Sequence, residues 1–104
     1  MARMLVIYRT PKDVEAFNRH YFETHIPLAK KLPGLRKYEI SFGTVNVIAG
    51  PTDIYLIGIL HFDDVDAMNK AFASPEGRAA AEDRQNYAPD GTGVQILLFE
   101  DRDV

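Results

Sequence analysis

The stretch FNRHYFETHIPLAKKLPGLRKY, residues 17–38, decides the fold because it joins a helix, a histidine close to a proline, and the start of a strand. With about 3.6 residues per turn, one face of the helix consists of Val14, Phe17, Tyr21, Thr24, Leu28 and Leu32. His25 falls at the edge of this stripe, one turn after Tyr21. We therefore expect the imidazole of His25 to point inward.

Pro27 interrupts this helical pattern. It has no amide hydrogen, its ring collides with the carbonyl of Glu23, and it pushes the residue before it away from helical dihedral angles. We predict a kink or break at residues 24–26, with Pro27 opening a short second helical piece and a backbone carbonyl freed beside His25. Leu-Pro-Gly at 32–34 then ends the helix, and a strand begins.

The remaining elements follow from apolar periodicity and capping residues. Alternation predicts strands at 3–9, 35–42, 54–62 and 94–99. Asp13, Asp64 and Ser74 are expected N-caps of helices, the last two at about 65–73 and 75–86. The order is βαββαβ, which predicts an α+β, ferredoxin-like protomer with a four-stranded antiparallel sheet, occupying residues 1–104 as one domain.

Three of the four predicted strands are apolar on both faces. Helices on one side of such a sheet leave the other side uncovered, and a patch of this size exceeds what monomers usually expose. We therefore expect a homodimer whose sheets pack face to face.

Composition narrows the possible partners and compartments. The net charge of −3 and the absence of a basic run interleaved with aromatic residues argue against nucleic-acid binding. No apolar run approaches the roughly 20 residues that span a bilayer, so we expect no membrane segment and a cytoplasmic location. The chain has no cysteine, which excludes disulfides and thiolate chemistry.

Several of these residues together resemble a known family. They are Tyr21, His25, Pro27-Leu28, the run Leu32-Pro33-Gly34-Leu35-Arg36-Lys37-Tyr38, Ser74-Pro75-Glu76 and Asp83. In this order and spacing they resemble the EthD family of the dimeric α/β-barrel superfamily, over nearly the whole chain. The resemblance implies a homodimer that forms a shared α/β barrel, with a small-molecule pocket between sheet and helices in each protomer.

The resemblance also implies a range of chemistry. The family takes its name from a protein needed alongside an oxygenase system that degrades a branched alkyl ether. The wider superfamily includes cofactor-free monooxygenases, lactone isomerases, polyketide cyclases and haem-dependent enzymes. Kinship at the level of the fold does not select one reaction among these.

His25 and Asp83 are the first candidates for catalysis. A partly buried imidazole can take and return a proton near neutral pH, although a histidine here could equally tie down the carbonyl freed by Pro27. Asp83 shares an inward stripe of the last helix with Tyr87, and a buried carboxylate needs a partner. That partner is His25, Tyr87 or an arginine such as Arg36, and a purely structural ion pair is the competing interpretation.

Aromatic residues supply the expected substrate contacts. Tyr21 is assigned to the catalytic group because it lies one turn from His25, and the candidates for substrate binding are Tyr8, Tyr38, Tyr55, Phe42 and Tyr87. Such tyrosines are more often amphipathic core residues. His20 is expected on the solvated surface and His61 at the dimer interface. Three histidines on separate elements make a weak metal-ligand set, so no metal is expected.

The hypothesis that follows is a small enzyme without a bound cofactor that acts on an apolar, oxygen-bearing molecule, with His25 as general acid/base. The reaction is oxidation, or proton transfer such as isomerisation, cyclisation or dehydration. Two alternatives stay open. One is a non-catalytic protein that delivers a hydrophobic metabolite to an oxygenase; the other is a haem-binding relative, for which one axial histidine would suffice.

Overall fold

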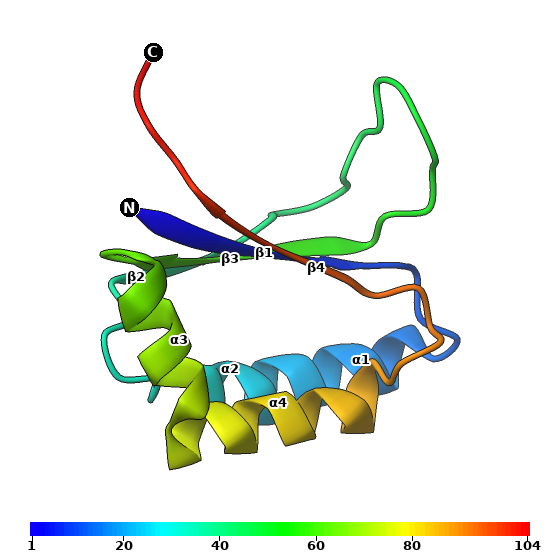
Figure 1. The fold of residues 1–104 in the computed structure, drawn as a ribbon. Helices are drawn as coiled ribbons and strands as arrows, with labels where there is room; N and C mark the ends of the chain where they lie inside the picture. Colours follow the sequence, from blue (N-terminus) through cyan, green and yellow to red (C-terminus); the bar gives the residue numbers. More distant parts are fainter.

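The computed structural model describes residues 1–104 and contains one four-stranded antiparallel sheet with helices on one face (Figure 1). The strands are β1 (Ala2–Tyr8), β2 (Lys37–Ile40), β3 (Leu56–Phe62) and β4 (Gln95–Glu100), in the spatial order β2-β3-β1-β4. The helical segments are α1 (Val14–His20), η1 (Tyr21–His25), α2 (Ile26–Ala29), α3 (Val65–Ala73) and α4 (Pro75–Tyr87). The predicted ferredoxin-like arrangement is confirmed. None of the helices is long and apolar enough to cross a membrane.

Side chains cap the helices at the predicted residues. Asp13 accepts a hydrogen bond from the Ala16 amide at 3.0 Å, and Asp64 accepts one from Ala67 at 2.7 Å. Ser74 caps α4 in the same way, with proline at the first position of that helix. These caps satisfy amides that have no partner inside the helix, so sequence chemistry alone sets where α1, α3 and α4 begin.

Of the predicted kink or break at residues 24–26, the break is not present; the chain stays helical and forms a π-helical turn, η1, before α2. The amide of Ile26 donates to the carbonyl of Tyr21, five residues back. Pro27 occupies the first turn of α2 as predicted. Pro27 has no N–H, so it could not donate the α-helical hydrogen bond to the Glu23 carbonyl in any case. A π turn at this place therefore gives up one hydrogen bond fewer than a π turn in a helix without proline.

The strands differ from the prediction mainly around β2. This strand covers only residues 37–40 instead of 35–42, and Phe42 lies in the following loop with its side chain fully exposed. Gly43 and Asp53 both adopt left-handed backbone conformations, with φ of 74° and 71°. They turn the 41–55 segment away from the sheet, so the continuous ladder of β3 starts at Leu56 rather than residue 54.

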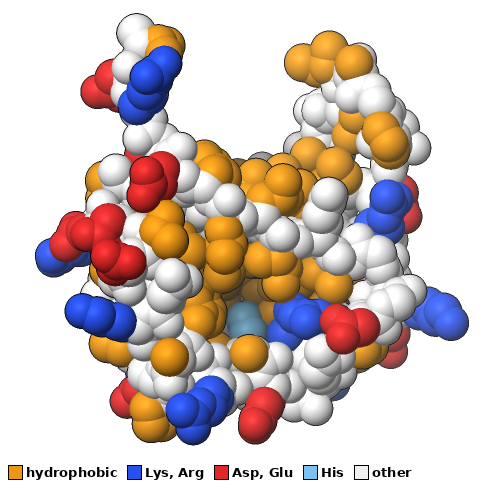
Figure 2. Space-filling model, in the orientation of Figure 1, with side chains coloured by type: hydrophobic (Ala, Val, Ile, Leu, Met, Phe, Trp, Pro, Cys, Tyr) orange, Lys and Arg blue, Asp and Glu red, His pale blue; other side chains and the backbone are white.

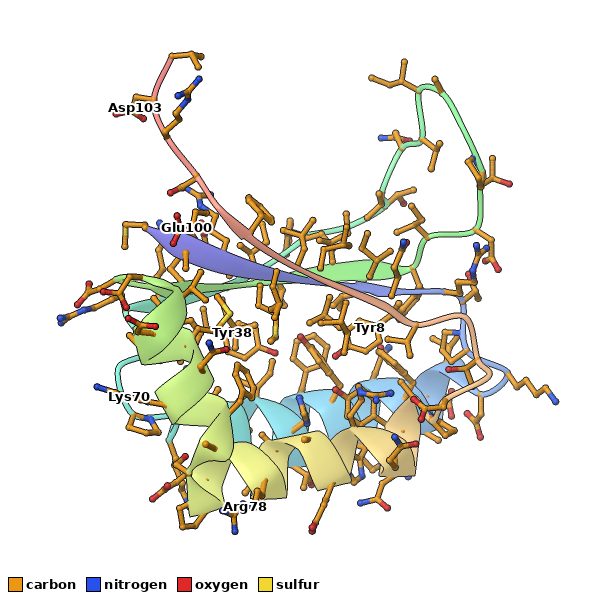
Figure 3. All side chains as sticks on the ribbon, in the orientation of Figure 1. Tyr8, Tyr38, Lys70, Arg78, Glu100 and Asp103 are labelled. Carbon is orange, nitrogen blue, oxygen red and sulfur yellow. The ribbon has the colours of Figure 1, made fainter.

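Apolar side chains between sheet and helices form two clusters. One contains Ala2, Ala29, Leu32, Leu60, Phe62, Met68 and Ala71. The other contains Val6, Tyr8, Phe17, Tyr21, Leu56 and Ala88. Figure 3 shows Tyr8 and Tyr38 in the layer between the sheet and the helices, whereas Lys70 and Arg78 point outward from α3 and α4. Both clusters lie on the helix-covered face of the sheet.

Gly58 in β3 allows the helical layer to approach the sheet closely. A side chain at this position would point toward the helices, and its β-carbon would lie 3.3 Å from the hydroxyl oxygen of Tyr21. Tyr21 itself is completely buried and its hydroxyl is bonded to that of Tyr38 at 2.7 Å. If either tyrosine moved to make room for a larger residue at position 58, this hydrogen bond would be lost.

We therefore predict that Gly58→Ala lowers the free energy of unfolding by about 1–3 kcal/mol, because the added methyl group overpacks a filled site. Urea denaturation measures this loss. In a Tyr21→Phe background the obstructing oxygen is absent, so the same substitution should cost less. Equal costs in the two backgrounds would show that the Tyr21 hydroxyl is not what restricts residue 58.

Candidate functional site

One carboxylate on α4 joins two histidines of the preceding helical layer. Asp83 Oδ1 lies 2.8 Å from His20 Nε2, and Asp83 Oδ2 lies 3.0 Å from His25 Nδ1. Asn86 donates a further hydrogen bond to Oδ1 at 3.2 Å. His25 and Asp83 are both buried. Of the predicted partners of Asp83, His25 is therefore the one that it contacts. Arg36 pairs instead with Asp63 on the surface.

The shared carboxylate determines which ring nitrogens carry hydrogen. An ionised carboxylate only accepts hydrogen bonds, so His20 must donate from Nε2 and His25 from Nδ1. The second nitrogen of the neutral His25 ring, Nε2, then holds a lone pair. It has no partner in the chain, and no buried side-chain nitrogen or oxygen lacks one. His25 Nε2 is therefore not completely enclosed by the chain.

Electrostatics keep this pair in the form that can accept a proton. Burial is the largest influence on His25 and lowers the pKa of its imidazole, and Asp83 offsets this only in part. Burial would raise the pKa of the Asp83 carboxyl, but hydrogen bonds from His20, His25 and Asn86 outweigh it and hold that pKa below its usual range. At neutral pH a neutral imidazole thus faces an anionic carboxylate.

The π turn explains how both histidines reach Asp83. Residues five apart on an α-helix point about 140° away from each other, at roughly 100° per residue. In a π turn the residues i and i+5 are hydrogen-bonded to each other and lie close to the same side. His20 is the last residue of α1 and His25 the last residue of η1, so the two histidines are five residues apart across the π turn. The prediction that His20 is a solvated surface residue is therefore wrong; its side chain is only 29% exposed.

Tyrosines surround His25. The ring of Tyr87 lies 4.7 Å from the imidazole between centroids, and the ring of Tyr21 stacks on it at 5.8 Å. Their hydroxyls form two pairs, Tyr8 with Tyr87 and Tyr21 with Tyr38, each at 2.7 Å. Burial raises the pKa of all four phenols. They remain protonated, so they can orient a ligand but cannot act as bases near neutral pH.

A cavity of about 170 Å³ opens beside His25, between the two apolar clusters. Its walls are Met4, Val6, Tyr8, His25, Ala29, Leu32, Tyr38, Leu60, Phe72, Ala80, Ala81, Arg84 and Ile96. Figure 2 shows the hollow between sheet and helices, with a histidine at its floor and a Lys or Arg side chain beside it. The volume suits roughly one aromatic ring, since a cavity of about 150 Å³ accepts benzene.

A second, larger cavity of about 690 Å³ shares Tyr8 with the first and is also lined by Tyr87. It is lined by His20 and by the exposed loops at residues 9–13 and 88–94. The two histidines that share Asp83 therefore line different cavities. No group of three His, Asp or Glu side chains is arranged so that it could hold a metal ion.

Not every predicted site residue joins this arrangement. His25, Asp83, Tyr21, Tyr8, Tyr38 and Tyr87 come together around one point. Tyr55 does not line either cavity; its hydroxyl donates to Asn18 at 2.7 Å. Phe42 lies outside both cavities in the exposed 41–55 loop. His61 lies on the far face of the sheet, buried and bonded to Glu39 at 2.6 Å.

Sequence reasoning missed His20, Asn86 and Arg84. Asn86 follows Asp83 by three residues on α4, and that spacing could have predicted their bond. Arg84 lines the cavity as its only charged side chain apart from the titratable His25. His20 could have been found only by anticipating the π turn.

The fold and site define a class: a ferredoxin-like α+β protein with a histidine–carboxylate pair at an apolar cavity. The family model described as "EthD domain" matches residues 9–91 of the chain. A relative in Rhodococcus erythropolis is 34% identical over 104 residues, which are 99% of this chain and 96% of the relative. It is described as an uncharacterized 11.0 kDa protein in the thcB–thcC intergenic region. The chain belongs to the EthD family.

Solved structures agree with this assignment. An "ethyl tert-butyl ether d (EthD) family protein" from Bacillus halodurans is 31% identical, with a TM-score of 0.86 over 98% of this chain and 99% of that one. SnoaB from Streptomyces nogalater, described as a cofactor-independent oxygenase, is 16% identical with a TM-score of 0.64 over 99% and 94%. The second likeness shows the fold alone.

We predict that Asp83→Asn lowers the pKa of His25 further, because the carboxylate is what raises it against the effect of burial. Titration of the histidine ring protons by NMR measures the shift. Glu82→Gln removes an exposed carboxylate from the neighbouring position of α4 and serves as the control. A His25 pKa that rises or stays constant in Asp83→Asn would contradict the assigned electrostatics.

Proposed function

We propose that this chain is a small-molecule enzyme in which His25 acts as the general base on an apolar, oxygen-bearing substrate. One arrangement carries the proposal: His25 lines an apolar cavity, its Nδ1–H is held by Asp83 at 3.0 Å, and its Nε2 has no partner within the chain. Asp83 positions the ring and stabilises the imidazolium that forms when a proton is taken.

The tyrosines have a supporting role in this proposal. Tyr8 and Tyr38 line the cavity, and their hydroxyls are the groups that we expect to donate a hydrogen bond to a substrate oxygen. Tyr21 and Tyr87 pack on the imidazole and hold its plane. Proton removal from carbon or oxygen then begins either isomerisation or reaction with molecular oxygen. Membership of the EthD family supports a place in small-molecule catabolism.

The lowered pKa of His25 sets the expected pH dependence. The base is active when neutral, and burial moves its protonation to pH values below the ordinary 6.5. Activity should therefore persist through pH 6.5 and decline only as the pH falls through this lowered pKa. A pH–activity profile in which activity is already lost as the pH falls toward 6.5 would contradict a buried imidazole as the base.

The two alternatives make different demands on the cavity. Delivery of a hydrophobic metabolite needs only the apolar walls and would not depend on His25. A haem bound through His25 would need space for a four-ring macrocycle, whereas the cavity holds about one ring. The haem interpretation does not fit the residues present, and delivery remains the competing outcome of the experiment below.

We predict that His25→Ala lowers proton abstraction by about 10²–10⁴-fold. The assay follows deuterium exchange from D₂O into a panel of enolisable single-ring ketones by mass spectrometry, so the complete reaction need not be known. His61→Gln is the matched control, because His61 is also buried and carboxylate-bonded but lies on the opposite face of the sheet. Full exchange in His25→Ala, with ligands still bound, would favour delivery.

We also propose a homodimer built through the open face of the sheet. Leu5, Ile7, Ile57, Ile59, Leu97 and Phe99 point away from the helices, and the last two are 39% and 41% exposed. The 41–55 loop and the C-terminal tail both rise from this side (Figure 1). The loop carries the fully exposed side chains of Phe42 and Ile48. A second copy would cover this apolar surface.

We predict that Ile59→Lys converts the dimer to a monomer. Ile59 lies opposite Leu5 in the β1–β3 ladder, so the lysine would place a charge in the middle of the proposed interface. Native mass spectrometry reports the assembly mass directly. Val14→Lys adds the same charge on α1, at a partly exposed position, and should leave the dimer intact. A wild-type monomer would disprove the proposed dimer.

A further inference from the structure

Arg84 is the unexplained residue of the cavity beside His25. Twelve other residues line this space, and none of them is an arginine, lysine, aspartate or glutamate. The side chain of Arg84 is only 17% exposed. A guanidinium in a mostly apolar wall is costly unless it has an anionic partner, so its neighbours must account for it.

The partners within the chain use only part of the guanidinium. Nη1 donates to the carbonyl of Ala88 at 2.8 Å, and Nη2 donates to Asp90 Oδ1 at 3.1 Å. An arginine has five N–H donors, so three remain without a partner in the chain. Nε is one of these, and it is accessible, because no buried side-chain nitrogen lacks a hydrogen bond.

The pairing with Asp90 is the weaker part of this arrangement. Asp90 lies in the loop after α4, and its side chain is 81% exposed. Ion pairs with such exposed groups are screened by water and salt, and they contribute little to stability. An anion inside the cavity would meet less competition from solvent than Asp90 does, so it could recruit the free N–H groups of Arg84.

The chemistry of His25 would create such an anion. When Nε2 takes the proton of a phenol or enol O–H, the electron pair of that bond stays on the substrate oxygen, and the imidazole becomes imidazolium. No group is oxidised or reduced in this step. The product is an oxyanion in an apolar cavity of about 170 Å³, where an unpaired charge would be expensive.

We propose that Arg84 binds this oxyanion, and that the substrate is a phenol or enol of about one ring whose conjugate base carries its charge on oxygen. The inference deepens the proposed function and depends on it for its catalytic meaning. Arg84 and His25 line the same cavity and come from different elements, α4 and η1, which allows one oxygen to lie between an acceptor and a donor.

The test compares two ligands of nearly the same shape. At mildly alkaline pH free 4-nitrophenol is ionised, whereas 4-nitroanisole is its uncharged methyl ether. Calorimetry on wild type and Arg84→Gln should show that the variant binds the phenolate about 10- to 100-fold more weakly, the usual effect of losing a hydrogen bond to a charged group. Its affinity for the ether should stay within about twofold of wild type.

Three further variants sharpen the result. Arg84→Lys keeps the charge and should retain most of the preference for phenolate, which separates charge from folding. Asp90→Asn removes the competing carboxylate and should tighten phenolate binding. Arg78→Gln, on the exposed face of the same helix, should change neither ligand.

Two outcomes would overturn the inference: failure of the wild type to bind the phenolate, or equal weakening of both ligands in Arg84→Gln. Because binding is measured without turnover, a preference for phenolate combined with normal exchange in His25→Ala would disprove the proposed base but leave the oxyanion site. The reverse pattern would disprove the role of Arg84 alone.

Discussion

The π turn at Tyr21–His25 is the constraint on which the site depends. Phe17, Tyr21, His25 and Ala29 follow one another at intervals of four residues, and all are buried. On a regular α-helix each such step drifts by roughly 40°, so three steps would carry Ala29 about 120° away from Phe17. The wider turn absorbs this drift. It keeps Phe17 in one apolar cluster, Ala29 in the other, and His25 between them.

The same turn makes the electrostatics of Asp83 possible. A single imidazole would occupy one oxygen of the carboxylate and leave the other to be satisfied by water or by Asn86 alone. With His20 on one oxygen and His25 on the other, the buried carboxylate is hydrogen-bonded on both sides and stays ionised. An ionised Asp83 is what holds the hydrogen of His25 on Nδ1 and leaves Nε2 free.

Local chemistry explains which features could be predicted from the sequence. The N-caps at Asp13, Asp64 and Ser74, the order of the elements and the inward stripe containing Asp83 each depend on residues close together in the chain, and the structure agrees with them. The π turn could not be predicted, because a proline in a helix is compatible with a kink, a break or a wider turn. His20 was misplaced for that reason alone. Phe42 was misplaced because left-handed residues at both ends of the 41–55 loop end the strand pairing early.

Burial gives each polar group around the cavity one available role. The phenols of Tyr8 and Tyr38 have raised pKa values, so they keep their protons and can only donate or accept hydrogen bonds. Arg84 has no lone pair to offer at any ordinary pH. Burial disfavours the charged state of acids and bases alike. For His25 this lowers the pKa of the imidazole, so the ring stays neutral and keeps a free lone pair. No other polar group at this cavity is left in a proton-accepting form. The apolar lining that excludes water from the cavity therefore leaves His25 as the base and the other polar groups as those that orient the substrate.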